Sequence, residues 1–434
     1  MATTGSKAYI LAVILLVVGL LVGYGVGIMT APAPAPTEEA PAPVGVTGTV
    51  KIGLLVDLTG GLATYGENSQ AAAELAERQV NDWLAARGED WRIDVIVEGT
   101  VPEDPSIALA KVQSLQAQGV RFIVGPMSSA EVSELKAYVD ANNILLISMS
   151  STSPALAIPN DNVFRFCPTD VIQGPAAAAV AWAQGIRHLV IMWRGDTWGD
   201  GLKESVAEAF QQLGGQVYEA SRYSPDATEF SAEVADLASI VQDLVNQYGA
   251  DQVGVELIAF KEAAAVFQAA AGYDVLRQVK WIGSDGTAQL SQLIETAEVA
   301  QFAADVEFLN PIFAPGASPF HDDVLNYVKQ KLGREPDAYA YATYDAIWAI
   351  AMAIEWVDSD DPMKVKEVLP EVVARMVGGS GVFQLNEDGD RAFSDYDLYV
   401  VWPTDGGYEW RKAGVYRAAT GTVEWEDWWL ARGS

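Results

Sequence analysis

Short apolar runs alternate with longer amphipathic segments along most of the chain from Thr49 onward. The apolar runs are rich in β-branched residues and end at turn formers, which is typical of strands that helices cover on both faces. Strands that alternate with helices in this way form parallel sheets with right-handed crossovers. The units are too many for one sheet, so the pattern predicts an α/β protein with two similar lobes. The predicted strands lie at 50–58, 91–97, 122–124, 144–148, 188–192, 217–223, 253–257 and 281–283.

The alternation is interrupted in the middle of the chain and changes character near its end. It pauses at Pro168, and a helix follows Asp170, which predicts a crossing between the two lobes. The tail at 424–430 is rich in tryptophan and is compatible with packing on the body or on a neighbouring protein. Beyond residue 310 the predicted elements are helices at 320–332 and 339–357 and antiparallel strands around 383, at 396–401 and at 408–416.

Hydroxyl-rich turns follow two successive predicted strands. In parallel α/β sheets, ligands bind beyond the carboxyl ends of the strands. Free backbone N–H groups and hydroxyls at that edge can hold a small anion such as a carboxylate, although Ser and Thr are also ordinary turn residues. The pattern therefore predicts a binding site without a catalyst. The residues concerned are Ser128 and Ser129 after the strand at 122–124, and Ser150, Ser151 and Thr152 after the strand at 144–148.

An uncharged apolar stretch at 8–29 follows Lys7 near the N-terminus. At about 1.5 Å per residue it is long enough to cross a hydrocarbon core of roughly 30 Å. It is longer than the usual apolar region of a signal peptide and lacks a small-x-small cleavage site, which favours a membrane anchor over a cleaved signal. Lys7-Ala8 also resembles the processing site of archaeal pilin-like signals, whose apolar part is retained.

A proline- and alanine-rich stretch at 31–48 comes next and predicts an extended linker between this segment and the body. Lys7 is the only charge before the apolar stretch, and the positive-inside rule then places the body outside the cytoplasm. We therefore expect residues 1–30 to form an N-terminal transmembrane helix, an anchor or signal segment that leaves the body on the extracytoplasmic face of the cell membrane, or secreted if it is cleaved.

The composition argues against several classes of function. A net charge of −31 disfavours binding to nucleic-acid phosphates. The single cysteine, Cys167, permits no internal disulfide, and its apolar neighbours predict a buried thiol. His188 and His321 lie far apart without zinc-spaced partners, and no nucleophile elbow or Walker loop occurs. We therefore expect neither enzymatic activity nor a cofactor, a metal or a nucleic-acid partner.

Several segments, in order along the chain, carry a resemblance to one family. They lie at 51–60, 63–66, 125–129, 146–154, 165–174, 196–202 and 282–286. Together they resemble the substrate receptors of the branched-chain amino acid ABC importers, the leucine/isoleucine/valine-binding-protein-like proteins. The resemblance implies a type I periplasmic-binding-protein fold, in which two Rossmann-like lobes with parallel sheets are joined by three hinge crossovers. It implies that residues 49–169 and 314–391 form lobe 1 and that residues 170–313 and 392–434 form lobe 2.

The same resemblance implies how an amino acid would be held. Ser129, Ser150 and Thr152 would bind the α-carboxylate through hydroxyl and backbone groups. Asp285 would accept the α-ammonium from the opposite lobe. An amino acid carries both charges close together, so partners on separate lobes would make it a bridge that favours the closed state.

Three further residues are implied near the cleft, and two positions depart from the family pattern. Tyr65 and Trp198 would line the cleft, and Asp170 either reaches the cleft or only caps the helix that follows it. Asp285 stands where the leucine-type receptors usually carry Glu, and Trp198 stands where they carry Tyr. The preference among amino acid side chains is therefore left open.

The resulting functional prediction is an extracytoplasmic substrate-binding protein of an ABC importer. It would capture an amino acid, branched-chain or similarly apolar, between two closing lobes and deliver it to a membrane permease. One alternative is a ligand-binding sensor or a structural or assembly protein of the cell surface with the same fold. Another is a receptor for an amide- or urea-type ligand that lacks an ammonium group.

Overall fold

The computed structural model describes residues 45–432, and the account below concerns the compact unit that begins at Val46. The predicted anchor or signal segment at 1–30 and most of the linker at 31–48 lie outside the described residues. Within the described range, no helix combines the length and the apolar character needed to cross a membrane.

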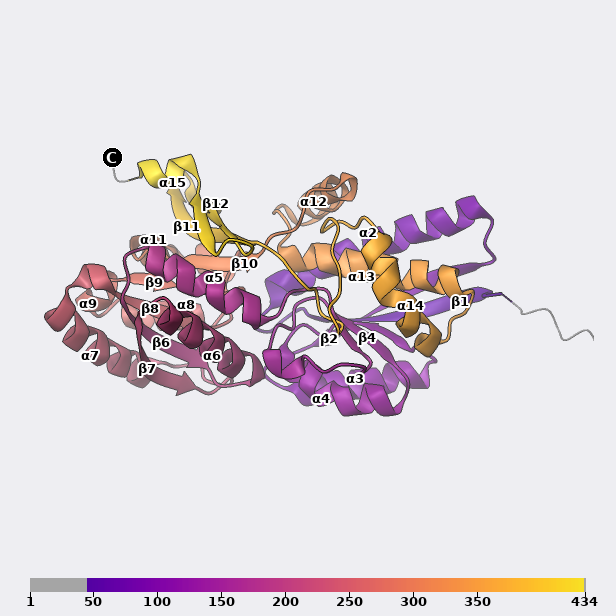
Figure 1. The fold of residues 1–434 in the computed structure, drawn as a ribbon, viewed down its shortest axis with the longest axis horizontal. Helices are drawn as coiled ribbons and strands as arrows, with labels where there is room; N and C mark the ends of the chain where they lie inside the picture. The colour runs from indigo at the N-terminus through magenta and orange to yellow at the C-terminus, as the bar shows by residue number, and fades with distance from the viewer. Residues whose placement is uncertain (1–44, 433–434) are drawn as a thin grey trace, which may run out of the picture. The chain divides into compact units, whose positions relative to one another are not determined.

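A five-stranded parallel sheet has the strand order β2-β1-β3-β4-β5. Its strands are β1 (Gly48–Asp57), β2 (Trp91–Thr100), β3 (Phe122–Val124), β4 (Leu145–Ser148) and β5 (Val163–Arg165). Helices α3 (Pro105–Ala117) and α4 (Ser129–Ala141) cover one face, and α2 (Ala63–Arg87) and α13 (Ala338–Val357) cover the other (Figure 1). Strands β3, β4 and β5 are buried on both faces, and in β3 and β4 this burial explains the nearly continuous apolar sequence.

An eight-stranded sheet has the order β13-β12-β11-β10-β9-β8-β6-β7, with β6 to β10 parallel and the last three strands antiparallel. Helices α5 (Asp170–Ala183) and α6 (Thr197–Gln212) pack together on it, whereas α8 (Ala263–Ala270) packs with both α7 (Ser231–Tyr248) and α11 (Ala297–Asp305). Its strands are β6 (His188–Arg194), β7 (Gln216–Tyr223), β8 (Val253–Ile258), β9 (Lys280–Ile282), β10 (Leu309–Phe313), β11 (Tyr396–Thr404), β12 (Gly407–Arg417) and β13 (Thr422–Trp425).

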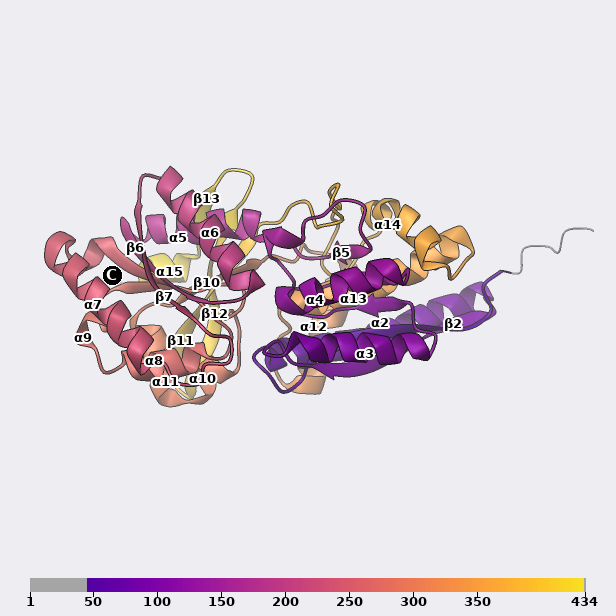
Figure 2. The same ribbon diagram turned by 90° about the horizontal axis from the view of Figure 1, so that it is seen from below.

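The chain passes between the two sheets three times. It enters the eight-stranded sheet after β5, returns after β10, and enters it again before β11 (Figures 1 and 2). The remaining helices are α9 (Asp274–Arg277), α10 (Gln292–Glu295), α12 (Pro319–Leu332), α14 (Pro362–Arg375) and α15 (Asp427–Ala431); the 3-10 turns are Pro154–Leu156 and Ala250–Gln252. The predicted α/β architecture with parallel sheets is confirmed.

Two sequence predictions near the C-terminus have clear outcomes. The strand predicted around residue 383 is wrong, because the chain there forms turns at Gly381 and Gly389, both of which have positive φ. The tryptophan-rich tail packs on the body: Trp429 is buried, and the Trp428 indole nitrogen donates to the Lys412 carbonyl oxygen at 2.9 Å.

Two glycines allow the close approaches that shape the sheet edge facing the site. A Cβ at Gly66, in the first turns of α2, would lie 1.6 Å from the Asp57 carbonyl oxygen. Gly125, just after β3, has φ of 98°, and its Cβ would lie 2.1 Å from the Leu55 carbonyl oxygen. Only glycine fits either backbone position, so α2 starts directly against the end of β1.

Glu256 in β8 is a buried carboxyl group within the eight-stranded sheet. Its side chain is fully buried, and neither of its oxygens has a hydrogen-bond partner among the described residues. Burial raises the pKa of Glu256 well above its ordinary value of 4.5. The folded protein therefore retains a proton that the unfolded chain releases, so the stability falls as the pH rises above about 4.5.

Replacing Glu256 with methionine is expected to stabilise the protein at pH 8 by about 1–4 kcal/mol, because it removes a carboxyl group that is costly to bury. At pH 4 the gain should shrink, since the wild-type carboxyl group is then neutral in the folded state and mostly neutral in the unfolded state. Urea unfolding of both proteins at the two pH values measures the difference. An equal gain at both values would show that ionisation is not its cause.

Candidate functional site

The turn after β3 and the turn after β4 bring their hydroxyl groups together at the carboxyl edge of the five-stranded sheet. Ser128 caps α4, with its Oγ accepting from the Glu131 N–H at 3.3 Å while Glu131 Oε2 accepts from the Ser128 N–H at 3.1 Å. Ser129 Oγ accepts from the Ser153 N–H at 3.1 Å, and Ser150 Oγ donates to the Met127 carbonyl oxygen at 2.8 Å. The two turns therefore hold each other in place.

A buried ion pair fixes the second of these turns from behind. Arg165 in β5 is fully buried and contacts both carboxylate oxygens of Asp390, each at 2.6 Å. Its Nη1 also donates to the Ser153 carbonyl oxygen at 2.6 Å and to the Ser151 carbonyl oxygen at 3.3 Å. The backbone of the serine turn is thus held by a guanidinium group whose charge is already matched by Asp390.

Asp285 follows β9 and faces the hydroxyl groups from the edge of the other sheet. Its Oδ2 accepts from the Tyr339 hydroxyl at 2.5 Å, and its carbonyl oxygen accepts from the Tyr65 hydroxyl at 2.8 Å. Its N–H donates to Gln173 Oε1 at 2.8 Å. Oδ1 has no hydrogen-bond partner in the described chain, and burial raises the pKa of Asp285 to about 6. One carboxylate oxygen is thus left for a ligand.

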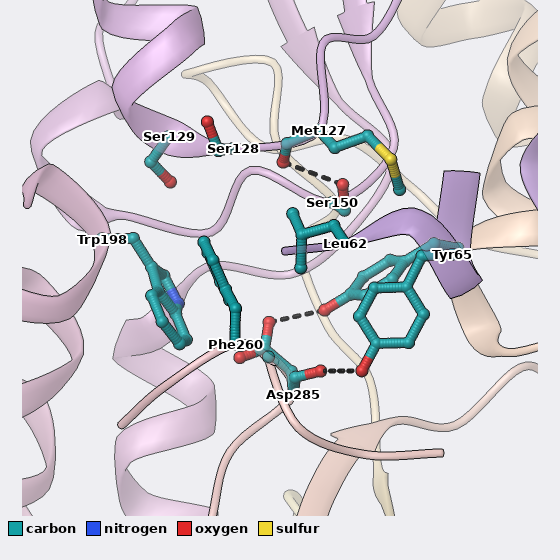
Figure 3. A pocket seen from close by; sticks show the side chains of 11 residues that line it. Leu62, Tyr65, Met127, Ser128, Ser129, Ser150, Trp198, Phe260 and Asp285 are labelled. Atoms are coloured by element: carbon teal, nitrogen blue, oxygen red, sulfur yellow. Dashed lines mark hydrogen bonds between the residues drawn. The ribbon is translucent and has the colours of Figure 1, made fainter. Parts of the chain in front are cut away.

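The serine turns and Asp285 line opposite sides of one cavity (Figure 3). Trp198 at the start of α6 and Phe260 after β8 stack at 4.6 Å between ring centroids, 17° from parallel, and form an aromatic wall. The cavity has a volume of about 20 Å³, which is room for about one water molecule. Its lining residues are Leu62, Tyr65, Met127, Ser128, Ser129, Ser150, Trp198, Phe260, Asp285, Gly286 and Tyr339.

Comparison with known proteins identifies the family. The model of a family described as periplasmic binding protein matches residues 49–405, which is most of the chain. The chain belongs to the periplasmic binding proteins. An uncharacterized protein of Methanocaldococcus jannaschii is 33% identical over 397 residues, covering 87% of this chain and 92% of that protein.

Two further similar proteins carry more specific descriptions. The leucine-, isoleucine-, valine-, threonine-, and alanine-binding protein of Pseudomonas aeruginosa is 24% identical, covering 84% of this chain and 90% of its own. A solute binding protein of an ABC transporter from Rhodopseudomonas palustris, solved in complex with p-hydroxybenzoic acid, has a TM-score of 0.67 at 19% identity and covers 88% of this chain and 100% of its own. This chain is therefore a type I periplasmic binding protein whose relatives include leucine-, isoleucine- and valine-binding proteins, and it shares its fold with a solute binding protein of an ABC transporter.

The binding protein places five of the seven sequence-predicted site residues around the cavity. The five are Tyr65, Ser129, Ser150, Trp198 and Asp285, whereas Thr152 and Asp170 do not line the cavity. Asp170 starts α5 behind the cavity, where its N–H donates to the Thr152 carbonyl oxygen at 2.9 Å.

A cleft role was predicted from the sequence for neither Tyr339 nor Phe260, both of which line the cavity. Tyr339 stands in the first turn of α13, where the Asp337 carboxylate accepts its N–H at 2.8 Å. This aspartate marks the start of the helix, whereas no local signal in the sequence shows which tyrosine of the helix faces the cavity. Tyr341 and Tyr344, on the same helix, are also buried but do not line this cavity.

Other reactive side chains of the binding protein lie away from the cavity lining. Cys167 is buried, its thiol faces the Ser151 carbonyl oxygen at 3.4 Å, and burial raises its pKa. His188 stacks on Tyr248, and His321 stacks on Tyr341. Within residues 45–432, no three histidine, cysteine or acidic side chains are grouped so that they could hold a metal ion.

Proposed function

We propose that this binding protein captures an α-amino acid between its two sheets and delivers it to a membrane ABC importer. The observation that carries the proposal is the position of Asp285 Oδ1, a buried oxygen without a hydrogen-bond partner within residues 45–432, across one cavity from the Ser129 and Ser150 turns. An ammonium group supplies the positive counter-charge that the Asp285 carboxylate needs. Hydroxyl groups and backbone N–H groups can donate hydrogen bonds to a carboxylate. A zwitterion brings both groups in one small molecule.

The size of the cavity indicates how the ligand enters. About 20 Å³ is far too little for an amino acid, so the two sheets must separate, or the lining must shift, before one can bind. Tyr65 and Tyr339 reach Asp285 from helices that pack on the five-stranded sheet, and these two hydrogen bonds join the two sides of the cleft. In this proposal the cleft lies between lobe 1 at 49–169 and 314–391 and lobe 2 at 170–313 and 392–434.

The stacked Trp198 and Phe260 rings favour an apolar ligand side chain against the aromatic wall. A second candidate ligand is an aromatic acid, since the Rhodopseudomonas palustris neighbour was solved with p-hydroxybenzoic acid. Such an acid has no cation for Asp285, which would remain an unpaired buried carboxyl group. We therefore favour an amino acid with an apolar side chain. We further propose that residues 1–30 keep the protein at the outer face of the membrane.

A thermal-shift screen of the full-length protein tests the ligand class, with unfolding monitored by tryptophan fluorescence. The compounds are the common amino acids, benzoate and 4-hydroxybenzoate, small amides with urea, and sugars. A ligand at about 100 times its Kd stabilises the folded state by about 2.7 kcal/mol, so apolar amino acids should raise the melting temperature. A shift with benzoates or amides and with no amino acid would contradict the proposal. A sensor or surface assembly protein that has lost its ligand would respond to none of them.

A further inference from the structure

Two buried carboxyl groups, one lining the cavity and one behind it, are bridged by a glutamine, and each has an oxygen without a hydrogen-bond partner in the described part of the chain. They belong to Asp170 and Asp285, which are 0% and 4% exposed, and the free atoms are Asp170 Oδ2 and Asp285 Oδ1. Gln173 connects the two residues: its Nε2 donates to Asp170 Oδ1 at 2.8 Å, and its Oε1 accepts from the Asp285 N–H at 2.8 Å.

The charged and titratable groups around this pair leave its charge unmatched. Arg165, the cation that acts on Asp170, is held by both oxygens of Asp390, and Arg391 donates to Ser380 and faces Asp345. The remaining titratable groups that face the pair are Tyr65 and Tyr339 on Asp285, and Tyr396 and Cys167 on both carboxyl groups. Each of these four is neutral when protonated, so none supplies a positive charge.

Two buried carboxyl groups bridged by one glutamine side chain cannot both stay ionised without a cation. Burial raises the pKa of Asp285 to about 6. Burial and then the negative charge of Asp285 raise the pKa of Asp170 well above its ordinary value. The two residues therefore titrate as a pair that keeps one proton, and Asp285, which lines the cavity whereas Asp170 does not, is the carboxyl group that a ligand can reach.

We propose that Asp170 stays protonated in both the free and the ligand-bound protein, and that the ammonium group of the ligand takes the place of the proton on Asp285. This inference rests on the proposed function, in which an amino acid fills the cavity. The proton from the Asp285 carboxyl group passes to the solvent, the ammonium group keeps all of its own protons, and no covalent bond to carbon changes. Ligand capture is thereby coupled to the release of a proton at mildly acidic pH.

Isothermal titration calorimetry of the full-length protein with L-leucine, or with the amino acid that shifts the melting temperature most, tests the coupling between pH 5 and pH 8. Below pH 6 the Kd is expected to rise by up to about tenfold for each unit of pH, and above pH 7 it should be flat. At pH 5 the measured heat should depend on the ionisation enthalpy of the buffer, with close to one proton released. A flat Kd and buffer-independent heats overturn the inference.

The variant Asp170→Asn distinguishes two hypotheses. In one, Asp170 is protonated and neutral; in the other, it is ionised and pairs with the ammonium group of the ligand. Asparagine mimics the neutral acid, so the Kd at pH 7.5 should stay within a few-fold of wild type. A loss of a hundredfold or more would overturn the inference. Glu256→Met, which removes a buried carboxyl group elsewhere, is the matched control and should leave the pH profile of binding unchanged.

Infrared spectroscopy without any ligand gives a readout that does not depend on binding. At pH 7.5 the wild type should show a carbonyl band of a protonated carboxylic acid that is missing from Asp170→Asn, and absence of that difference would overturn the inference. If no amino acid binds at any pH, the proposed function fails, whereas this infrared difference still tests the protonation of Asp170. If an amino acid binds without releasing a proton, only the inference fails.

Discussion

Replacing Asp285 with asparagine is expected to weaken amino-acid binding by about 30-fold or more, because an ion-paired partner in a desolvated site is worth about 2–5 kcal/mol. Asparagine keeps the shape of the side chain and can still accept from the Tyr339 hydroxyl. It lacks the negative charge that the ammonium group requires. Calorimetric titration of wild type and variant with L-leucine at pH 7.5 measures the loss.

The control for this prediction is 4-methylpentanoate, which is leucine without its ammonium group. The wild type should strongly prefer leucine over this acid, and Asp285→Asn should lose most of that preference. If both compounds bind the variant with the same proportional loss, Asp285 supports the fold of the cleft and does not recognise an ammonium group. A neutral amide or urea ligand would bind wild type and variant comparably.

Replacing Asp390 with alanine is expected to lower the free energy of unfolding by about 3–5 kcal/mol, because it leaves the guanidinium group of Arg165 buried without a counter-charge. Both side chains are almost fully buried, at 0% and 1% exposed. Arg165 also holds the Ser151 and Ser153 carbonyl oxygens, so ligand affinity should fall together with stability. Urea unfolding measures the first effect and calorimetry the second.

An exposed ion pair provides the comparison for Asp390→Ala. Arg417 and Glu424 contact each other at 2.7 Å with side chains 43% and 60% exposed. Glu424→Gln should therefore change the free energy of unfolding by no more than about 1 kcal/mol. Similar small effects of both substitutions would mean that Arg165 finds another partner or water when Asp390 is removed.

The layer pattern was predictable because burial on both faces leaves a plain signal in the sequence. The strand predicted at 122–124 is β3, and the strand predicted at 144–148 differs from β4 by one residue. The strand predicted around 383 failed for a local reason. Glycines with positive φ turn the chain on both sides of Phe383, and an apolar residue there fills the core as part of a loop.

Only part of the site could be predicted, because the local sequence shows where a turn lies better than it shows which way each side chain of the turn points. Hydroxyl groups after parallel strands correctly indicated the carboxyl edge of the five-stranded sheet. Side chains at nearby positions of one turn nevertheless face different ways. Ser150 lines the cavity, whereas Thr152 does not. Tyr339 reaches Asp285 across 54 residues of chain, and its helix buries three tyrosines within six positions. Which of them faces the cleft depends on how α13 is rotated against α2, a property of packing between distant segments.

A crystal structure of the protein with a bound apolar L-amino acid would test the account most directly. We expect the ammonium group within hydrogen-bond distance of Asp285 Oδ1, the carboxylate group against the turns of Ser129 and Ser150, and the side chain along the Trp198 and Phe260 rings. An ammonium group remote from Asp285, or a ligand whose two charged groups both contact residues of the same sheet, would contradict it.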